Sequence, residues 1–422
     1  MIRTIRFAGG AAVLGLMLAA AACNNDTLNR PFSFTAIDPL FERYVSMGNS
    51  LTAGFQSGGI NDSTQQQSYA VQLARAMHAP FFVPSLTKPG CPPPFTNVWT
   101  GARVTPTGYP PSTATSCYLR NIPSEPPPYI SNTAVPGAKV EDLYANLDTA
   151  SSANSLTQFI LGGLTQVQMM RKAQPTFVSV WIGNNDILGA ATSATNPGDS
   201  TKITSLANFQ ARYSALIDSI KAAGPKGAIL IGVANVTEIP YFSAGATYWA
   251  IKNGLVPGSA FPPAFTVSAN CAPAAAIPGV GRGDTTLVPF PYGAALLGAA
   301  AAGAPRNLDC SDSVAAIVTP PELRKLVATD SAYNLFISAQ ATAHGWAYFS
   351  PNGALDSLRT LAQPNTVVRA FPLIGQACSA NPFGTAFSCD GVHASAATHK
   401  LIANHLRVAI NATYSTSIPV IP

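Results

Sequence analysis

Two short stretches of the chain contain residue types that could together catalyse acyl transfer. Ser50 follows the short apolar run 44–47, and Gly48 permits a tight backbone turn between them. Asp390 and His393 stand three residues apart near the C-terminus. A serine hydroxyl is a poor nucleophile at neutral pH, so it requires a base such as His393 and an acid such as Asp390 that orients this base. From its position alone, Ser50 could equally be the N-cap of a helix.

Ester cleavage also requires hydrogen-bond donors for the negatively charged oxygen that forms in the reaction. The candidate donors are the backbone N–H groups of Ser50 and Gly137 and the side-chain amide of Asn185. Gly137 stands just ahead of an expected helix, where a glycine can offer its N–H group to an anion. Asn185 follows a second apolar run at 176–182. We expect its neighbour Asp186 to cap the helix or turn that follows this strand and not to take part in catalysis.

Apolar runs and helical periodicities alternate along the chain. The expected strands are 43–47, 176–182, 227–234 and 346–350, and the expected helices are 66–78, 140–147, 155–173, 205–223, 320–344 and 395–414. This alternation predicts an α/β fold in which helices cover both sides of a parallel sheet. Because ligands bind at the carboxyl edge of such a sheet, we expect Ser50 and Asn185 to meet there.

Length and composition limit the possible architectures. A chain of 422 residues exceeds the size at which a single core usually stops growing, so we expect one large domain with insertions. Two stretches rich in proline and glycine, 80–129 and 241–319, show no sustained periodicity and are interpreted as loop insertions. The apolar stretch 294–302 is too short to cross a bilayer, so it is either core or a flap over the site.

The charge pattern argues against nucleic acid as a partner. Only 10% of the residues are charged, and the net charge of +5 comes without a Lys/Arg cluster beyond the N-terminus. A nucleic-acid-binding surface needs such a cluster.

The N-terminus has the pattern of an export signal. Two arginines precede an apolar stretch at 7–20, and small residues then lead to Cys23. The segment resembles a bacterial lipoprotein signal, which implies that Cys23 is lipidated and becomes the first residue. No aspartate follows Cys23, a pattern compatible with sorting to the outer membrane. A plain secretory signal is the alternative. We expect a signal peptide at 1–22, a tether at 23–40 and the catalytic domain at 41–422.

Six further cysteines are present, and an even number in an exported chain favours disulfides. Pairing of sequence neighbours is the simplest arrangement because short loops close readily. The expected pairs are Cys91 with Cys117, Cys271 with Cys310, and Cys378 with Cys389. The cysteine spacings match no zinc signature, and His393, His399 and His405 do not share a helix face, so we expect neither a metal nor a cofactor.

Four blocks of the sequence together resemble the SGNH hydrolases, also called the GDSL esterase/lipase family. They occur in the family's order: Gly48-Asn49-Ser50-Leu51-Thr52, Gly137 in its Ala-Val-Pro-Gly context, Gly183-Asn184-Asn185-Asp186 and Asp390-Gly391-Val392-His393. The resemblance implies a flavodoxin-like three-layer α/β/α sandwich with a mostly parallel sheet. Asn49 departs from the family pattern because an aspartate usually stands there, which puts the hydrogen bonding of the loop and the charge of the site in question.

The resemblance also implies the roles of the site residues. Ser50 would be the nucleophile, His393 the base and Asp390 its partner, while Gly137 and Asn185, with the N–H group of Ser50, would stabilise the oxyanion. The predicted reaction is ester hydrolysis through an acyl-enzyme.

The sequence therefore predicts an exported serine esterase or lipase, held through Cys23 at the outer membrane or cell surface. Its substrate would be an acyl lipid or an acetylated carbohydrate. An acyltransferase that uses the same acyl-enzyme but excludes water is one alternative. A non-catalytic binding lipoprotein is another, but the presence of Ser50, Asp390 and His393 argues against it.

Overall fold

The computed structural model describes residues 35–121, 126–144, 155–256, 258–361 and 365–422. From Ala36 onward the chain forms one compact unit. The expected signal peptide and the lipidation site Cys23 lie outside the described residues, as does most of the expected tether. Ile37 already donates a backbone hydrogen bond to Met77, and Leu40 is buried, so the described end of that segment packs onto the core. The expected domain boundaries stay predictions.

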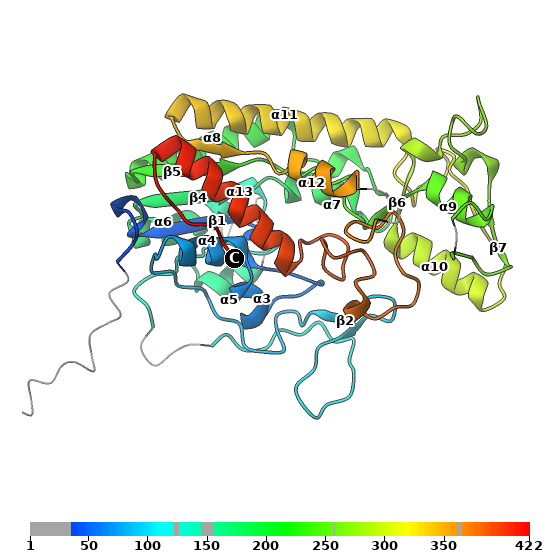
Figure 1. The fold of residues 1–422 in the computed structure, drawn as a ribbon, viewed down its shortest axis with the longest axis horizontal. Coiled ribbons are helices and arrows are strands. Elements are labelled where there is room, and N and C mark those ends of the chain that lie inside the picture. Colours follow the sequence, from blue (N-terminus) through cyan, green and yellow to red (C-terminus); the bar gives the residue numbers. More distant parts are fainter. Residues whose placement is uncertain (1–34, 122–125, 145–154, 257, 362–364) are drawn as a thin grey trace, which may run out of the picture. The chain divides into compact units, whose positions relative to one another are not determined.

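A parallel sheet of four strands lies at the centre of the fold (Figure 1). Its strands, in spatial order, are β1 (Tyr44–Gly48), β4 (Phe177–Trp181), β5 (Gly227–Ile231) and β10 (Ala347–Phe349). Asn132 forms a further parallel bridge to Ser46, on the edge of β1 that does not face β4. With this bridge the strand order is that of flavodoxin-like folds. The predicted α/β fold with a parallel sheet is confirmed.

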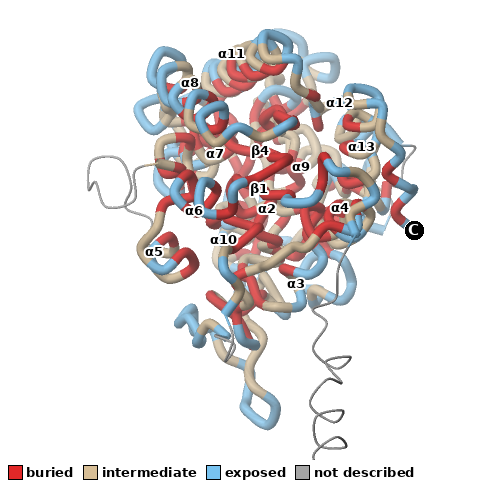
Figure 2. The backbone as a smooth tube through the Cα atoms, turned by 90° about the vertical axis from the view of Figure 1, so that its left-hand side faces the viewer, coloured by how far each residue is buried: buried red, intermediate tan, exposed pale blue. Residues whose placement is uncertain are grey.

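Helices cover both faces of the sheet, and the strand side chains alternate between two cores. Val45 and Val178 pack on the face covered by α6 (Gln166–Ala173), α8 (Leu206–Ala223) and α11 (Pro320–His344). Tyr44 and Phe177 pack on the opposite face, under α4 (Tyr69–Ala76) and α13 (Ala396–Tyr414). In Figure 2 the tube is red, the colour of buried residues, along β1 and β4 and on parts of the helices that cover them. Because both faces are covered, the strands are continuous apolar runs.

Local sequence signals account for where the long helices begin and end. Ser205 and Ser395 cap α8 and α13, since each hydroxyl accepts a hydrogen bond from a backbone N–H three residues later. Gly224 and Gly345 end α8 and α11 in the left-handed conformation, which glycine adopts without steric cost. The observed limits of these three helices lie within one residue of the predicted ones.

Three predicted helices differ from the observed ones. The stretch 155–173 forms two helices, α5 (Ser155–Leu161) and α6, because Gly162 and Gly163 between them have positive φ angles of 62° and 92°. The stretch 66–78 begins as a helix only at Tyr69, with Ser68 as its N-cap. The expected helix at 140–147 is a short 3₁₀ helix, Val140–Leu143, and its last residues lie outside the described part of the chain.

The second insertion contains regular structure that its sequence did not indicate. It forms a small core of its own around Tyr248, Phe265 and Leu308, closed by the Cys271–Cys310 disulfide. Its elements are β6 (Phe242–Ala244), α9 (Gly245–Lys252), β7 (Phe265–Val267), β8 (Leu287–Pro289), α10 (Phe290–Ala301) and β9 (Arg306–Leu308). Three-residue strands and helices rich in alanine and glycine leave little periodicity, so the expectation of an irregular loop was wrong.

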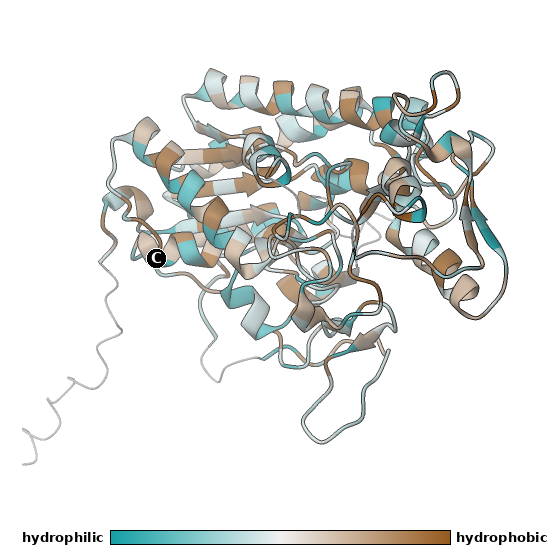
Figure 3. Ribbon diagram, turned by 45° about the vertical axis from the view of Figure 1, so that its right-hand side comes forward, coloured by the Kyte–Doolittle hydropathy of each residue, from teal (hydrophilic) through white to brown (hydrophobic). Residues whose placement is uncertain are grey.

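The remaining elements are short. They are α2 (Ser50–Ala53), α3 (Asp62–Gln66), β2 (Phe95–Asn97), β3 (Ala102–Arg103), α7 (Asn185–Ala191) and α12 (Asn352–Arg359). All three predicted disulfides are present: Cys91–Cys117, Cys271–Cys310 and Cys378–Cys389. Figure 3 shows hydrophobic colouring along the central strands and on parts of the helices. Among the described residues, no helix has both the length and the apolar character needed to cross a bilayer.

Two leucines that differ in burial should contribute very differently to the free energy of unfolding. Leu230 is fully buried in β5, whereas the side chain of Leu335 on α11 is 74% exposed. We expect Leu230→Ala to lower the free energy of unfolding by about 3 kcal/mol, because it leaves a cavity in the core. Leu335→Ala should change it by less than about 0.5 kcal/mol. Urea unfolding of both variants measures this, and equal losses would contradict the described burial.

Candidate active site

Ser50 lies at the carboxyl end of β1, where the backbone turns tightly into α2. A Cβ atom on Gly48 would lie 2.4 Å from Thr52 Oγ1 and 2.5 Å from the carbonyl oxygen of Trp181, so this position requires glycine. Asn49 is the N-cap of α2, and its Oδ1 accepts the N–H of Leu51 at 3.1 Å. The cap role that Ser50 could have played therefore belongs to Asn49. The Ser50 hydroxyl is left for another partner.

That partner is His393, and behind it lies Asp390. His393 Nε2 lies 2.9 Å from Ser50 Oγ, and His393 Nδ1 lies 2.8 Å from Asp390 Oδ2. The ring of Phe55 packs beside the imidazole, with 4.8 Å between the ring centres. The structure thus brings together the three residues that the sequence singled out, in a continuous serine–histidine–aspartate chain of hydrogen bonds. Such a chain can take the proton from the serine and hold the imidazole in the required tautomer.

Asp390 is a buried carboxylate whose oxygens accept several hydrogen bonds. Besides His393 Nδ1, the Gly58 N–H donates to Oδ2 at 2.6 Å. Oδ1 accepts from the N–H groups of Val392 and His393 and from Ser388 Oγ, at 2.8, 2.9 and 3.1 Å. Burial alone would raise the pKa of Asp390, but the charge and hydrogen bond of His393 and the backbone donors outweigh it and lower the pKa to about 2. Asp390 is therefore ionised throughout the neutral range.

A loop at Ser57 and Gly58 forms hydrogen bonds that hold the segment containing Asp390 in place. Ser57 N–H donates to Ser388 Oγ at 2.7 Å, and Ser57 Oγ accepts the N–H of Cys389 at 3.1 Å. Arg103 donates to the carbonyl oxygen of Gly58 at 2.8 Å, and its guanidinium group lies 3.8 Å above the centre of the Phe95 ring. The sequence did not point to these residues. The only available signal was the polar, glycine-rich run that follows Ser50.

The three candidate oxyanion donors are held near one another by short contacts. Asn185 is the first residue of α7, and its Nδ2 donates to the carbonyl oxygen of Ala138 at 2.8 Å, which leaves one amide hydrogen for a ligand. Gly137 precedes Ala138 in an exposed turn with φ of 81°. The Val135 N–H donates to the carbonyl oxygen of Gly48 at 3.2 Å, so the same turn adjoins the end of β1. Ser50 opens α2, where the first N–H groups have no intrahelical acceptor.

Gln166 is a positioning residue that sequence reasoning missed. Its side chain is buried and spans both backbone groups of Gly48: Oε1 accepts the N–H at 2.9 Å, and Nε2 donates to the carbonyl oxygen at 2.8 Å. These bonds connect the turn before Ser50 to α6. A signal was present, because Gln166 precedes the core residue Met170 by one helical turn, and a polar side chain on a core-facing side needs a partner.

Two further polar residues support the site without belonging to the hydrogen-bonded triad. The carboxyl group of Asp186 is buried and accepts the Val140 N–H at 3.0 Å, and burial raises its pKa to about 7. This hydrogen bond secures the 3₁₀ helix that follows Gly137. Asp186 does not cap the helix after its own strand, because it lies inside α7 and Asn184 is the N-cap. Asn49 Nδ2 lies 3.4 Å from Asn184 Oδ1, a contact in which an ionised aspartate could not act as donor.

Metal binding has no support among the described residues, because no group of three or more potential ligands occurs there. His399 is fully buried, its Nδ1 accepts the N–H of Tyr69 at 3.3 Å, and burial lowers its pKa to about 3. It is a neutral residue of the core.

The fold and the triad define a class of protein, the α/β serine hydrolases. Comparison with known families is more specific. Residues 44–264, just over half of the chain, match the GDSL-like lipase/acylhydrolase family, to which this chain therefore belongs. The match includes Ser50, Gly137 and Asn185 and ends before Asp390 and His393, which the structure brings to the same place. The protein is a serine ester hydrolase.

The comparisons with individual proteins are more distant. The chain is similar to LAE5, an alpha/beta hydrolase enzyme from the metagenome of Lake Arreo, at 12% identity and a TM-score of 0.38, over 88% of this chain and 95% of that one. It is also similar to Axe2, an acetylxylan esterase from Geobacillus stearothermophilus, at 13% identity and a TM-score of 0.37, over 89% of this chain and 95% of that one. Likenesses this weak say nothing about the substrate. Comparison with curated proteins finds no match.

The lowered pKa of Asp390 predicts a pH-dependent contribution to stability. The carboxyl group titrates at about 2 in the folded protein against 3.8 ordinarily, so its ionised form stabilises the fold above pH 4, and this stability is lost as the pH falls towards 2. We expect Asp390→Asn to lower the free energy of unfolding by about 2 kcal/mol at neutral pH. The difference from the unchanged protein should shrink below pH 4.

Denaturant unfolding across this pH range measures the difference. Asp218→Asn, an exposed change on α8, should leave the free energy of unfolding unaltered and serves as the control. A loss in Asp390→Asn that is the same at neutral and acid pH would contradict the assigned ionisation.

The Cys378–Cys389 disulfide should influence the activity of the enzyme. It closes the segment that ends immediately before Asp390, so replacing both cysteines with serine should loosen that loop and lower kcat several-fold on an acetate ester. The matched control replaces Cys271 and Cys310, whose disulfide lies in the second insertion, and should change kcat on acetate little. Equal kcat values in the unchanged protein and the first double variant would refute the loop's dependence on this bond.

Proposed function

We propose that the protein is an exported serine esterase that hydrolyses carboxylic esters through an acyl-enzyme on Ser50. The observation that carries this proposal is the unbroken hydrogen-bond chain from Ser50 Oγ through His393 to the ionised Asp390. Membership of the lipase/acylhydrolase family supports it independently.

The first half of the reaction forms the acyl-enzyme. Ser50 Oγ attacks the ester carbonyl carbon while His393 Nε2 takes its proton, and Asp390 stabilises the resulting imidazolium. The carbonyl oxygen becomes an oxyanion that accepts hydrogen bonds from the three candidate donors of the site. When this intermediate collapses, the bond to the leaving oxygen breaks, and His393 Nε2 passes its proton to the departing alcohol.

The second half repeats these steps with water. His393 removes a proton from a water molecule, the hydroxide attacks the acyl carbon, and the bond to Ser50 Oγ breaks as the proton returns to the serine. The products are a carboxylic acid and the free enzyme. If an alcohol replaces this water, the outcome is acyl transfer, so analysis of products in the presence of added alcohols separates hydrolase from acyltransferase.

The proposed location of the enzyme rests on the N-terminal sequence alone. A signal peptide at 1–22 and lipidation at Cys23 would place the catalytic unit on a membrane surface, at the bacterial outer membrane or cell surface. Three disulfides in the described chain support an oxidising compartment. Mass spectrometry of the mature N-terminus tests this: a diacylglyceryl group on Cys23 is expected, and an unmodified N-terminus at another residue would overturn it.

The test of the reaction is hydrolysis of a p-nitrophenyl ester series from acetate to palmitate. Ser50→Ala and His393→Ala should each lower kcat roughly ten-thousandfold or more, because the triad acts as a unit. Ser63→Ala, a change of an exposed serine just beyond the site, should retain full activity. Activity that persists in Ser50→Ala would show that another group is the nucleophile.

A further inference from the structure

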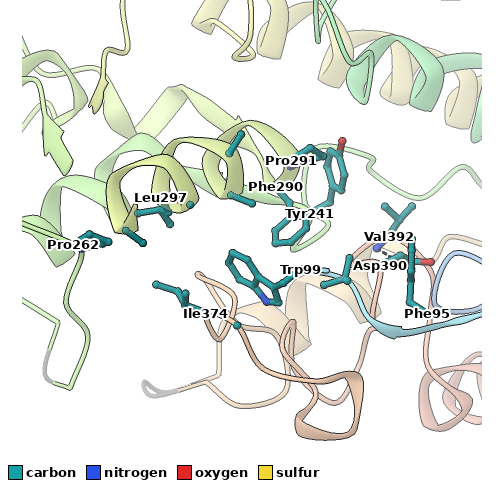
Figure 4. A pocket seen from close by; sticks show the side chains of 16 residues that line it. Phe95, Trp99, Tyr241, Pro262, Phe290, Pro291, Leu297, Ile374, Asp390 and Val392 are labelled. Atoms are coloured by element: carbon teal, nitrogen blue, oxygen red, sulfur yellow. Dashed lines mark hydrogen bonds between the residues drawn. The ribbon is translucent and has the colours of Figure 1, made fainter. Parts of the chain in front are cut away.

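A cavity of about 690 Å³ begins beside the catalytic loop. Asp390 and Val392, which precede His393 in the sequence, line one part of it. In Figure 4 these two residues lie together with Phe95 at one end, while Leu297 and Pro262 mark the other end. The cavity therefore extends away from the triad into the second insertion. No residue of the assigned oxyanion site contributes to it.

One long wall of the cavity is the exposed face of α10. Its lining residues Ala294, Ala295, Gly298 and Ala301 are small and recur at helical spacing. Between Pro291 and Ala301 this wall is about 15 Å long, because each residue of an α-helix advances the chain by about 1.5 Å. Because these side chains are small, they leave the space of the cavity along the helix unfilled. The whole of α10 contains no charged residue.

The opposite wall consists of large apolar and aromatic side chains from two other segments, Trp99 of the first insertion and Ile374 of the C-terminal loop. Two contacts fix Trp99 in place. Its Nε1 donates to the carbonyl oxygen of Leu373 at 3.0 Å, and its ring packs nearly perpendicular to that of Phe290, with 4.9 Å between the ring centres. Phe290 in turn contacts Phe383, with 5.1 Å between the ring centres. The cavity is thus formed before any ligand arrives.

Two backbone hydrogen bonds connect this cavity to the catalytic loop. The Tyr241 N–H donates to the carbonyl oxygen of Gly391 at 2.9 Å, and the Phe290 N–H donates to the carbonyl oxygen of Tyr241 at 2.8 Å. Phe290, the first residue of α10, is therefore connected through Tyr241 to Gly391, which lies two residues before His393. A ligand in the cavity lies at a set position relative to the triad.

The chemistry of the lining selects the kind of ligand. Asp390 is the one charged residue among the described residues that line the cavity, and its oxygens are already occupied by His393, Ser388 and backbone donors. A sugar placed here would lose water from its hydroxyl groups and gain few partners, which is costly. A hydrocarbon chain has no hydroxyl groups that would lose hydrogen bonds to water, and its burial is favourable in proportion to its length.

We propose that this cavity binds the acyl chain of the substrate ester and makes the enzyme selective for medium or long apolar chains over acetyl. The proposal rests on the proposed esterase function. A volume of about 690 Å³ lies within the range of cavities that enclose whole drug-sized ligands, so it far exceeds the needs of an acetyl group. Acetylated carbohydrate, the other substrate class that the sequence left open, has no comparable use for it.

Gly298→Leu tests this proposal by narrowing the cavity. A Cβ atom at Gly298 meets nothing within 4 Å, so the leucine enters open space without displacing the backbone, and it favours the helix more than glycine does. Gly353→Leu is the matched control, because Gly353 lies in α12, is equally unobstructed and does not line the cavity. We expect Gly298→Leu to lower kcat/KM on laurate esters about tenfold or more while acetate esters are unaffected.

The control variant should retain the chain-length profile of the unchanged protein. An unaltered ratio of laurate to acetate activity in Gly298→Leu, or a preference of the unchanged protein for acetate, would overturn the acyl-pocket proposal and leave the esterase function intact.

A binding measurement separates failure of the pocket from failure of the esterase. Titration calorimetry of the Ser50→Ala protein with sodium laurate should show binding with a negative heat-capacity change, the marker of apolar burial. Combining Ser50→Ala with Gly298→Leu should weaken this binding about tenfold, and combining it with Gly353→Leu should not. If laurate binds in this pattern but no ester is hydrolysed, the pocket proposal stands and the proposed reaction is refuted. Absence of laurate binding refutes the pocket whatever the activity.

Discussion

The buried carboxylate of Asp390 requires compensation, and much of the site exists to supply it. A mostly buried ionised group is stable only when hydrogen-bond donors replace the water that it has lost. Here the donors come from the imidazole, from the turn that contains Val392, and from the loop at Gly58, which is more than three hundred residues away in the sequence. The hydrogen bonds to Asp390 therefore hold the loop at Gly58 against the C-terminal segment and orient His393 towards Ser50.

The parallel sheet supplies the second half of this arrangement. Ser50 and Asn185 follow neighbouring strands, so the paired ends of β1 and β4 set the spacing of the nucleophile and one oxyanion donor. The connecting turns are secured by buried polar side chains, above all by Gln166 at Gly48 and by Asp186 at Val140. These groups do no chemistry. They hold the reacting groups on rigid elements, which is what preorganised catalysis requires.

Much of this arrangement could be predicted from the sequence, and the exceptions have physical causes. Continuous apolar runs predict buried parallel strands, and Ser205, Ser395 and Gly345 mark helix limits through local hydrogen bonding and backbone freedom. The break at Gly162 was missed because apolar spacing continues across it. The second insertion was read as irregular because its short elements are defined by contacts with one another and by the Cys271–Cys310 disulfide, not by a periodicity within each.

At the site itself, Ser50, Asp390 and His393 could be found because their chemistry is recognisable from residue type. Ser57, Gly58 and Arg103 could not, since they act through backbone groups and long-range contacts that no local pattern encodes. The acyl-sized cavity belongs to the same category: three segments that are distant in the sequence form it.

The separation of the triad along the chain has a consequence for biosynthesis. Ser50 and His393 lie 343 residues apart, so a ribosome that has made the nucleophile must still translate most of the protein before the base exists. Chains are made from the N-terminus and their segments fold as they emerge. Throughout that interval the growing polypeptide contains a serine with no means of activation. The catalytic chain of hydrogen bonds is therefore incomplete until residue 393 has been made and has folded against Ser50.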